Sequence, residues 1–169
     1  KAYESAKKTI DIEAGYVPGI VNMGIVYELM GEKKRAAEYY RHALERDETS
    51  SFAHFRLGML LYESEMKNEA VREFNLALEY DPDFLPAYNE LGIVALEEGR
   101  YENALEQLKK AVALDSTYAT AYYNMGGVLT NMGEYNHAAK AYEHYLSHAD
   151  TPDDSLEIRA KIAILSQKN

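Results

Sequence analysis

The chain has 169 residues, of which 47% are apolar and 27% charged, and it holds no run near the roughly 18 apolar residues that a transmembrane helix needs. Eighteen basic against 28 acidic residues leave a net charge of −10, and an acidic surface repels nucleic acids and anionic membranes. The absence of cysteine excludes disulfides and thiolate metal sites but leaves the compartment open between cytoplasm and periplasm.

Self-similarity at a fixed spacing is the strongest pattern in the sequence. Glycine recurs four times at intervals of 34 residues, and alanine does the same. The glycines are Gly24, Gly58, Gly92 and Gly126, and the alanines are Ala36, Ala70, Ala104 and Ala138. An aliphatic column follows the same period at Leu44, Leu78, Val112 and Leu146. A period of this length indicates a supersecondary unit that buries its faces by stacking on its neighbours.

This period and its residue types resemble the tetratricopeptide repeat, whose pattern runs from a bulky residue through Leu-Gly and Tyr to Ala, Phe, Ala and Pro. The third unit carries the pattern as Tyr88, Leu91, Gly92, Ala95, Gly99, Tyr101, Ala104, Leu108 and Ala111. The departures are mild, since only the second unit has the terminal proline, Pro82, and no unit has Trp. The resemblance covers residues 17–150. It implies an all-α fold, a right-handed α-solenoid (superhelix) of stacked antiparallel helix pairs.

In chain order, residues 1–16 are expected to form the second helix of a preceding repeat whose first helix lies upstream of Lys1. The four repeats that follow are expected at 17–50, 51–84, 85–118 and 119–152. Each holds two helices, which in the third repeat are predicted near 86–97 and 101–114, with Gly99 as the stop between them. The glycine and alanine columns are small because the two helices of a repeat cross closely there.

Residues 153–169 are predicted to form a C-terminal capping helix. One apolar stripe consists of Leu156, Ala160 and Ala163, and the stripe beside it consists of Ile158, Ile162 and Leu165. Terminal repeats of a solenoid need a helix that separates the last core from water, which favours a cap. A helix that binds a partner is the alternative.

The resemblance also implies that the first helix of each repeat lines a concave groove. The predicted partner-binding residues are Val21, Ile25, Glu28, Phe52, Phe55, Met59, Tyr62, Glu63, Asn89, Ile93, Leu96, Glu97, Tyr123 and Asn131. The family's clamp for chaperone carboxyl termini needs Lys, Asn and Arg at such positions. Val21 and Ile25 stand in its first two places, and Arg56 is the one cation adjacent, so this ligand mode is excluded.

The predicted groove is apolar and aromatic, with Glu28, Glu63 and Glu97 along one side. Such a surface favours an extended peptide or amphipathic helix with apolar anchors and basic flanks. The alternatives are that these residues pack within the array or that the surface has no ligand.

No catalytic or cofactor site is predicted. Phosphate-binding glycine motifs and the nucleophile elbow are absent from the sequence. His137, His144 and His148 fall within about 40° on one helix face, and the last two are spaced to chelate zinc or nickel. A solvent-facing stripe without metal is the favoured interpretation, because no further ligand stands in register. His54 replaces an aromatic residue in a packing column and is expected to be structural.

The sequence therefore predicts a non-enzymatic scaffold for protein–protein interactions, with no cofactor and no nucleic acid partner. The alternatives are a module that forms homo-oligomers through its array ends and an accessory domain of a larger protein. An enzyme within these residues is not expected, because solenoid repeats use their side chains for stacking.

Overall fold

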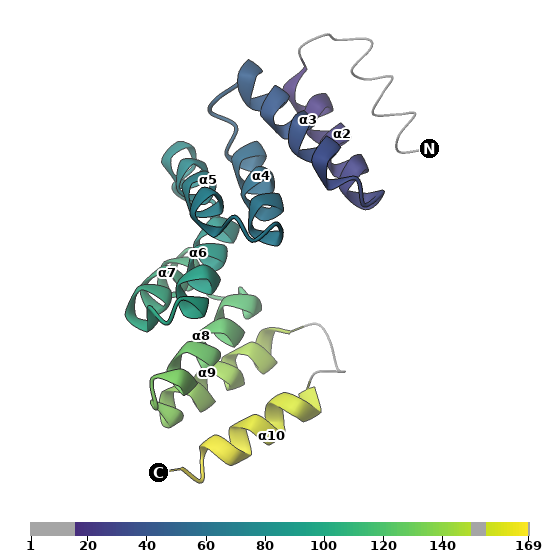
Figure 1. The fold of residues 1–169 in the computed structure, drawn as a ribbon. Helices are drawn as coiled ribbons and strands as arrows, with labels where there is room; N and C mark the ends of the chain where they lie inside the picture. Colours follow the sequence, from purple (N-terminus) through teal and green to yellow (C-terminus); the bar gives the residue numbers. More distant parts are fainter. Residues whose placement is uncertain (1–15, 150–154, 169) are drawn as a thin grey trace. The chain divides into compact units, whose positions relative to one another are not determined.

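The computed structural model describes residues 16–149 and 155–168, and every regular element in this part of the chain is a helix (Figure 1). The helices are α2 (Val17–Leu29), α3 (Lys33–Arg46), α4 (Ser51–Glu63), α5 (Lys67–Tyr80), α6 (Leu85–Glu97), α7 (Tyr101–Leu114), α8 (Ala119–Asn131), α9 (Tyr135–His148) and α10 (Ser155–Leu165). The helix expected over residues 1–16 lies outside the described residues, apart from Tyr16.

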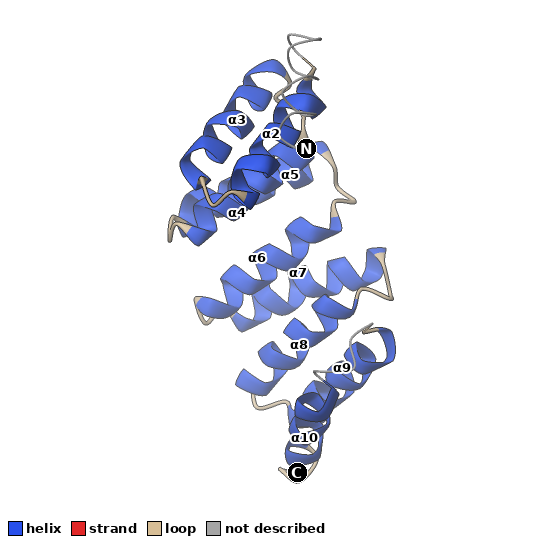
Figure 2. Ribbon diagram, turned by 90° about the vertical axis from the view of Figure 1, so that its right-hand side faces the viewer, coloured by secondary structure: helices blue, strands red, loops and turns tan. Residues whose placement is uncertain are grey.

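The chain divides into two compact units, which we call unit 1 (residues 1–84) and unit 2 (residues 85–169). In unit 1, α2 pairs with α3 and α4 pairs with α5, and α3 also packs against α4. In unit 2, α6 pairs with α7 and α8 with α9, while α10 packs on α9 (Figure 2). The predicted all-α fold of sequential antiparallel helix pairs is confirmed within each unit.

The two helices of each pair cross closely at the repeated glycine. A Cβ atom added to Gly92 would lie 2.7 Å from Cγ of Leu108, and one added to Gly58 would lie 2.7 Å from Cε1 of Phe74. Tyr40 and Tyr142 occupy the same place in the other two pairs. Since real Cβ atoms do not approach other atoms so closely, only glycine allows a large side chain to lie against the first helix.

A residue with positive φ stands two positions after the end of the first helix in every repeat. Gly31, Gly99 and Gly133 have φ values of 76°, 72° and 77°, and the corresponding residue of the second repeat is Glu65, with a φ of 61°. Glycine favours this left-handed conformation because it has no Cβ, whereas glutamate is strained in it. The turn thus has the same backbone in all four repeats despite the change of residue.

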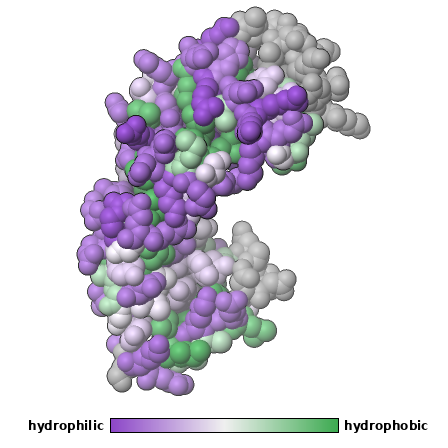
Figure 3. Space-filling model, viewed as in Figure 1, coloured by the Kyte–Doolittle hydropathy of each residue, from purple (hydrophilic) through white to green (hydrophobic). Residues whose placement is uncertain are grey.

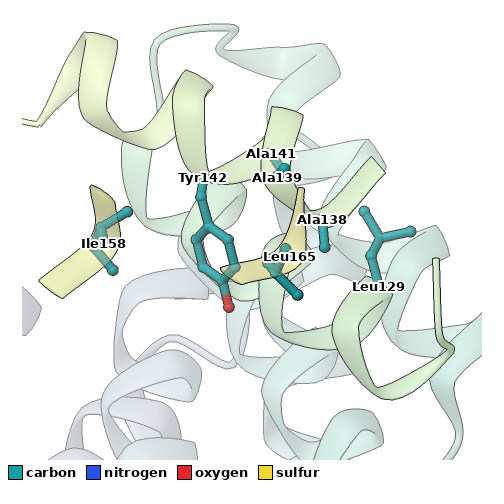
Figure 4. Packing of buried hydrophobic residues seen from close by; sticks show 7 residues of the cluster. All are labelled: Leu129, Ala138, Ala139, Ala141, Tyr142, Ile158 and Leu165. Carbon is teal, nitrogen blue, oxygen red and sulfur yellow. The ribbon is translucent and has the colours of Figure 1, made fainter. Parts of the chain in front are cut away.

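Helix α10 closes the hydrophobic core of unit 2. Ile158 and Leu165 are buried and join Leu129, Ala138 and Tyr142 in one cluster, which Figure 4 shows from close by. The other side of α10 is also apolar. It exposes Leu156, Ala160, Ala163 and Ile164. Hydrophobic surface is visible in the region of α10 in Figure 3. The last helix therefore covers the core and presents a second apolar face of its own.

Candidate partner-binding site

The predicted groove residues lie on the first helices of the pairs, α2 and α4 in unit 1 and α6 and α8 in unit 2. We call the surfaces that they form the first-helix surfaces of the two units. In unit 1, Glu28, Met59 and Glu63 line one cavity of about 360 Å³. The other residues around this cavity are Leu29, Lys33, Arg56 and Leu60. Three of the predicted residues are thus brought together around a hollow of the size that small ligands fill.

The carboxylates of this cavity are paired with cations of the same unit. Arg56 forms an ion pair with Glu28, and Nζ of Lys33 lies 3.0 Å from Oε2 of Glu63. Nε of Arg56 also donates to the hydroxyl of Tyr40 at 3.4 Å. The first-helix surface of unit 1 is therefore close to electrically neutral along this side, whereas the sequence led us to expect an acidic one.

Glu28 retains one oxygen without a partner. Its Oε1 is buried and accepts no hydrogen bond from the described residues, although the same carboxylate pairs with Arg56. A buried acceptor without a donor costs free energy, and this cost is removed by any ligand donor that reaches it. The carboxylate of Glu28 is therefore stabilised by Arg56 alone among the described residues.

Phenylalanine side chains form the apolar part of the first-helix surface of unit 1. The ring of Phe55 is half-buried and lies 5.8 Å from that of Phe74 and 5.2 Å from that of Phe84, measured between centroids. Phe52 meets Phe84 edge-on at 6.5 Å and remains 43% exposed. Phe55 therefore belongs largely to the packing of the unit, whereas Phe52 offers apolar area to a ligand.

In unit 2, an amide pair occupies part of the predicted surface. Asn89 is only 2% exposed, and its Oδ1 accepts a hydrogen bond of 2.9 Å from Nδ2 of Asn124. Its own Nδ2 donates to Oε1 of Glu90 at 3.1 Å. Burial raises the pKa of Glu90, and the hydrogen bond from Asn89 offsets part of this rise. Asn89 thus joins α6 to α8 and leaves little side-chain surface for a partner.

Tyr123 is the aromatic residue of the first-helix surface of unit 2. Its ring packs edge-on against Tyr142 at 5.8 Å and Tyr145 at 5.3 Å, and it remains 37% exposed. Nζ of Lys161, on α10, lies 5.5 Å from the ring centroid. A cation above an aromatic face is attracted by the electrons of the ring. Lys161 of the last helix therefore covers one face of the Tyr123 ring, a contact that the repeat pattern does not contain.

The remaining predicted residues differ widely in exposure. Val21 is 5% exposed and contributes almost no surface. The residues that are half-buried are Ile25, Tyr62, Ile93 and Leu96. Glu97 and Asn131 are exposed, and Nδ2 of Asn131 donates to the backbone oxygen of Gly127 at 2.9 Å.

Three residues that contribute to these surfaces, Lys33, Asn124 and Lys161, were not predicted from the sequence. Of these, Asn124 carries a signal, because it stands two periods, or 68 residues, after Arg56.

His54 is buried between two acceptors, as expected for a structural residue. Its Nδ1 lies 2.7 Å from Oε2 of Glu73, and its Nε2 lies 2.9 Å from the backbone oxygen of Glu48. Burial lowers the pKa of His54, but the hydrogen bonds to Glu73 and Glu48 outweigh it and raise the pKa above its ordinary value. The protonated ring is therefore the form that this site favours, because it donates to both acceptors.

The histidines of α9 do not converge on a common point. The ring of His144 stacks on that of Tyr122 at 4.9 Å, and Nδ1 of His137 lies 3.1 Å from Oε2 of Glu134. Nδ1 of His148 approaches the backbone oxygen of His144 at 2.9 Å. Within the described residues, no group of three or more His, Cys, Asp or Glu side chains is arranged to hold a metal ion. Nor is any helix in that part both long and apolar enough to span a membrane.

Comparison with protein families identifies the repeats. Residues 18–50 and 51–84 each match a family model described as tetratricopeptide repeat, and residues 95–133 match one described as TPR repeat. These matches cover more than half of the chain, and the helix pairs of both units follow the same period. The chain belongs to the tetratricopeptide repeat family, whose domains generally mediate interactions between proteins. None of the matched models describes an enzyme family. A comparison with curated proteins found no match.

Several solved structures share the fold. PilF of Pseudomonas aeruginosa superposes with a TM-score of 0.84 at 22% identity, over 96% of this chain and 74% of its own. YrrB, described as a TPR protein with an unusual peptide-binding site, gives 0.76 at 24% identity over 99% and 91% of the two chains. MamA gives 0.75 at 23% identity over 86% and 85%. At these identities the likeness concerns the fold alone.

Proposed function

We propose that this chain is a non-enzymatic scaffold whose first-helix surfaces bind a peptide or helix segment of a partner protein through apolar anchors. The observation that carries the proposal is Phe52, an exposed ring that packs edge-on against Phe84 and lies on α4, the helix that also supplies Arg56 and Met59 to the cavity of unit 1. Rigid aromatic side chains give large contact area at low entropic cost, which is why they dominate protein interfaces.

The cavity of unit 1 supplies the polar part of this recognition. Glu28 and Glu63 line this cavity with their carboxylates, and Met59 contacts the apolar side chains of the bound segment. The unusual peptide-binding site described for YrrB supports a peptide as the ligand class. A basic flank of the ligand has to compete with Arg56 and Lys33 for the two carboxylates, so we propose that apolar contacts provide most of the affinity.

The test is an affinity capture that compares two single substitutions of equally exposed residues. Phe52→Ser removes the ring from the first-helix surface, and Leu114→Ser removes an apolar side chain at the end of α7, where both residues are 43% exposed. We expect proteins captured by the native chain to be lost with Phe52→Ser and kept with Leu114→Ser. Loss in both variants, or in neither, would contradict the proposal.

The methyl resonances of the methionines show where on the chain a captured partner binds. Met59 lines the cavity of unit 1, so its carbon-13 methyl resonance should move when a segment of the captured partner is added. With Phe52→Ser the shift should require a higher peptide concentration. A bound peptide that leaves the Met59 resonance unmoved would place binding on another surface.

A second candidate function is self-assembly, which the outer face of α10 favours. Leu156 is 79% exposed and Ile164 is 57% exposed, on a helix whose inner face is already packed. Apolar patches of this kind mark contact sites between chains. Static light scattering should then give a mass that grows with concentration, and Leu156→Ser with Ile164→Ser should return it to that of the monomer. A native mass that stays monomeric at every concentration excludes this function.

A further inference from the structure

A second type of cavity lies on the opposite helices of the pairs. In unit 2, α7 and α9 flank a cleft of about 360 Å³ whose floor is supplied by α8. The apolar residues that line it are Leu105, Tyr122, Met125, Leu129 and Ala141. Three of these, Leu105, Tyr122 and Met125, are only half-buried, so the floor keeps apolar area open to solvent. This cleft shares no residue with the predicted groove.

The rim of the cleft is basic, although the chain as a whole is acidic. Lys109 lies on the α7 side, and Lys140 with the two histidines His137 and His144 lies on the α9 side. Neither lysine has an ion-pair partner within the described part of the chain. The one carboxylate at the rim, Glu134, is engaged with His137 at 3.1 Å. A net charge of −10 therefore coexists with a local surplus of cations around an apolar floor.

The same cleft occurs in unit 1, two periods earlier in the sequence. It measures about 290 Å³, with Leu57 and Leu61 on its floor in the places of Met125 and Leu129. Arg41 stands in the place of Lys109, and Lys34 adds a second cation to the rim. The cleft of unit 1 lies between α3 and α4, with Met66 at its edge, and its rim also carries Lys33 and the carboxylate of Glu38. In both units the basic side chains of the rim outnumber the carboxylates. His137, Lys140 and His144 line the cleft of unit 2, and their counterparts do not line that of unit 1.

We propose that these two clefts bind acidic segments of a partner protein, each placing one aliphatic or aromatic side chain on the apolar floor. The volumes admit a side chain of that size together with part of its backbone. Carboxylates on either side of the anchor would then reach the lysines of the rim, in the way that charge complementarity selects partners. The cleft of unit 2 shares no residue with the predicted groove, whereas the cleft of unit 1 shares Lys33 and Leu60 with the first-helix cavity, so unit 2 provides the independent test of this inference.

The experiment uses the full chain labelled with carbon-13 at its methionine methyl groups, because three methionines report on three different cavities. Met125 lines the cleft of unit 2, Met66 lines that of unit 1, and Met59 lines the cavity of the first-helix surface. The probe is a short synthetic peptide with aspartates on both sides of one leucine. We expect its addition to move the resonances of Met125 and Met66 and to leave that of Met59 in place.

Two matched variants isolate the charge of the rim. Lys109→Glu should weaken the titration of Met125 by about tenfold, the factor for roughly 1.4 kcal/mol, and leave that of Met66 nearly unchanged. Lys110→Glu makes the same change of net charge at the next residue of α7, which does not line the cleft, and should act weakly on both. Circular dichroism checks that the variants fold.

Two control peptides test the charge and the apolar anchor of the ligand separately. A peptide with lysines in place of the aspartates, or with serine in place of the leucine, should fail to move Met125. The proposal is overturned if the acidic peptide moves neither Met125 nor Met66, or if Lys109→Glu and Lys110→Glu have equal effects. It is also overturned if only phosphatidylserine vesicles move these resonances, since the rim would then recognise a membrane surface. A shift confined to Met59 would favour the first-helix surface and overturn the cleft.

Discussion

The two units join the first helices of their successive pairs through different polar contacts. Arg56 and Asn124 occupy the same place in the first helix of the second pair of each unit, and both reach across to the preceding first helix. Arg56 forms an ion pair with Glu28 on α2, whereas Asn124 donates a hydrogen bond to Asn89 on α6. The repeat thus places a polar side chain where the first helices of successive pairs meet. The residue on the preceding first helix determines whether that side chain forms an ion pair or a neutral hydrogen bond.

A second pair of equivalent residues shows the same freedom. His54 in unit 1 is buried against Glu73 and the backbone of Glu48, whereas its counterpart in unit 2, Tyr122, stacks on His144 and lines the cleft. The same position of the repeat therefore holds a buried, hydrogen-bonded side chain in unit 1 and a side chain that lines a surface cleft in unit 2. The shared frame is the glycine crossing, and the differences lie in the polar contacts built on it.

The largest expected effect concerns the crossing that both units share. Gly92→Leu should lower the free energy of unfolding by about 3 kcal/mol or more, because the new side chain would overlap Leu108. Urea denaturation followed by circular dichroism measures this. The control is Gly127→Ala, where a Cβ atom meets nothing closer than 3.9 Å, and which should stabilise by up to about 1 kcal/mol through helix propensity. Equal melting temperatures for Gly92→Leu and the native chain would refute the shared crossing.

The next effect separates the two polar junctions. Arg56→Met should cost about 1–3 kcal/mol, because Glu28 would be left largely buried with no cation. Adding Glu28→Leu should restore most of the loss, since the unpaired carboxylate is then removed as well. The corresponding change in unit 2, Asn124→Leu, leaves only a neutral amide without its donor and should cost less. If Arg56→Met and Asn124→Leu prove equally costly in urea unfolding, the contrast between the units is wrong.

A smaller effect concerns the turn after α4 in unit 1. Glu65→Gly should stabilise the chain by about 1 kcal/mol, because glutamate is strained at a φ of 61° where the other repeats have glycine. The reciprocal substitution Gly133→Glu, at the same turn of unit 2, should destabilise by a similar amount. Thermal denaturation of the two variants tests the pair, and a loss of stability in Glu65→Gly would show that its side chain makes a contact worth more than the strain.

The smallest effect is a dependence on pH that belongs to unit 1. The folded pKa of His54 is raised above its ordinary value of about 6.5, so its stabilisation is fully present below that value. The stabilisation is lost as the pH rises through the raised folded pKa. His54→Tyr, which copies Tyr122, should remove this loss. Urea unfolding between pH 6 and pH 8 compares the slopes, and an unchanged slope in the variant would assign the dependence to other groups.

Much of the fold was predictable because it depends on local spacing. The helices predicted near 86–97 and 101–114 are found at Leu85–Glu97 and Tyr101–Leu114, since the glycine stop and the small crossing residues occur in every repeat. The site was less predictable, and most of its residues remain predictions. Val21 and Asn89 occupy groove positions of the family, yet both are buried. Their environments depend on packing partners in other helices, which a repeat pattern does not specify.

The pairing of charges across the first-helix surface of unit 1 was hidden for the same reason. Glu28 and Arg56 are 28 residues apart, and Lys33 and Glu63 are 30 apart, so neither pair follows the period. Their contact requires both the crossing geometry and the rotamers of long side chains. The residues that recur every 34 positions therefore predicted the helices and the small residues at their crossings. The ion pairs of the surface could be identified only from the three-dimensional structure.

The order in which the helices pack has a consequence for how the chain folds. Almost every packed pair of helices, from α2 with α3 to α9 with α10, is adjacent along the chain. Contacts between residues close in sequence require little loop-closure entropy, and proteins built from them fold in microseconds to milliseconds. Each helix pair is a local nucleus, so folding can begin in either unit and spread to its neighbours. A ribosome-bound chain could thus acquire its structure repeat by repeat as synthesis proceeds.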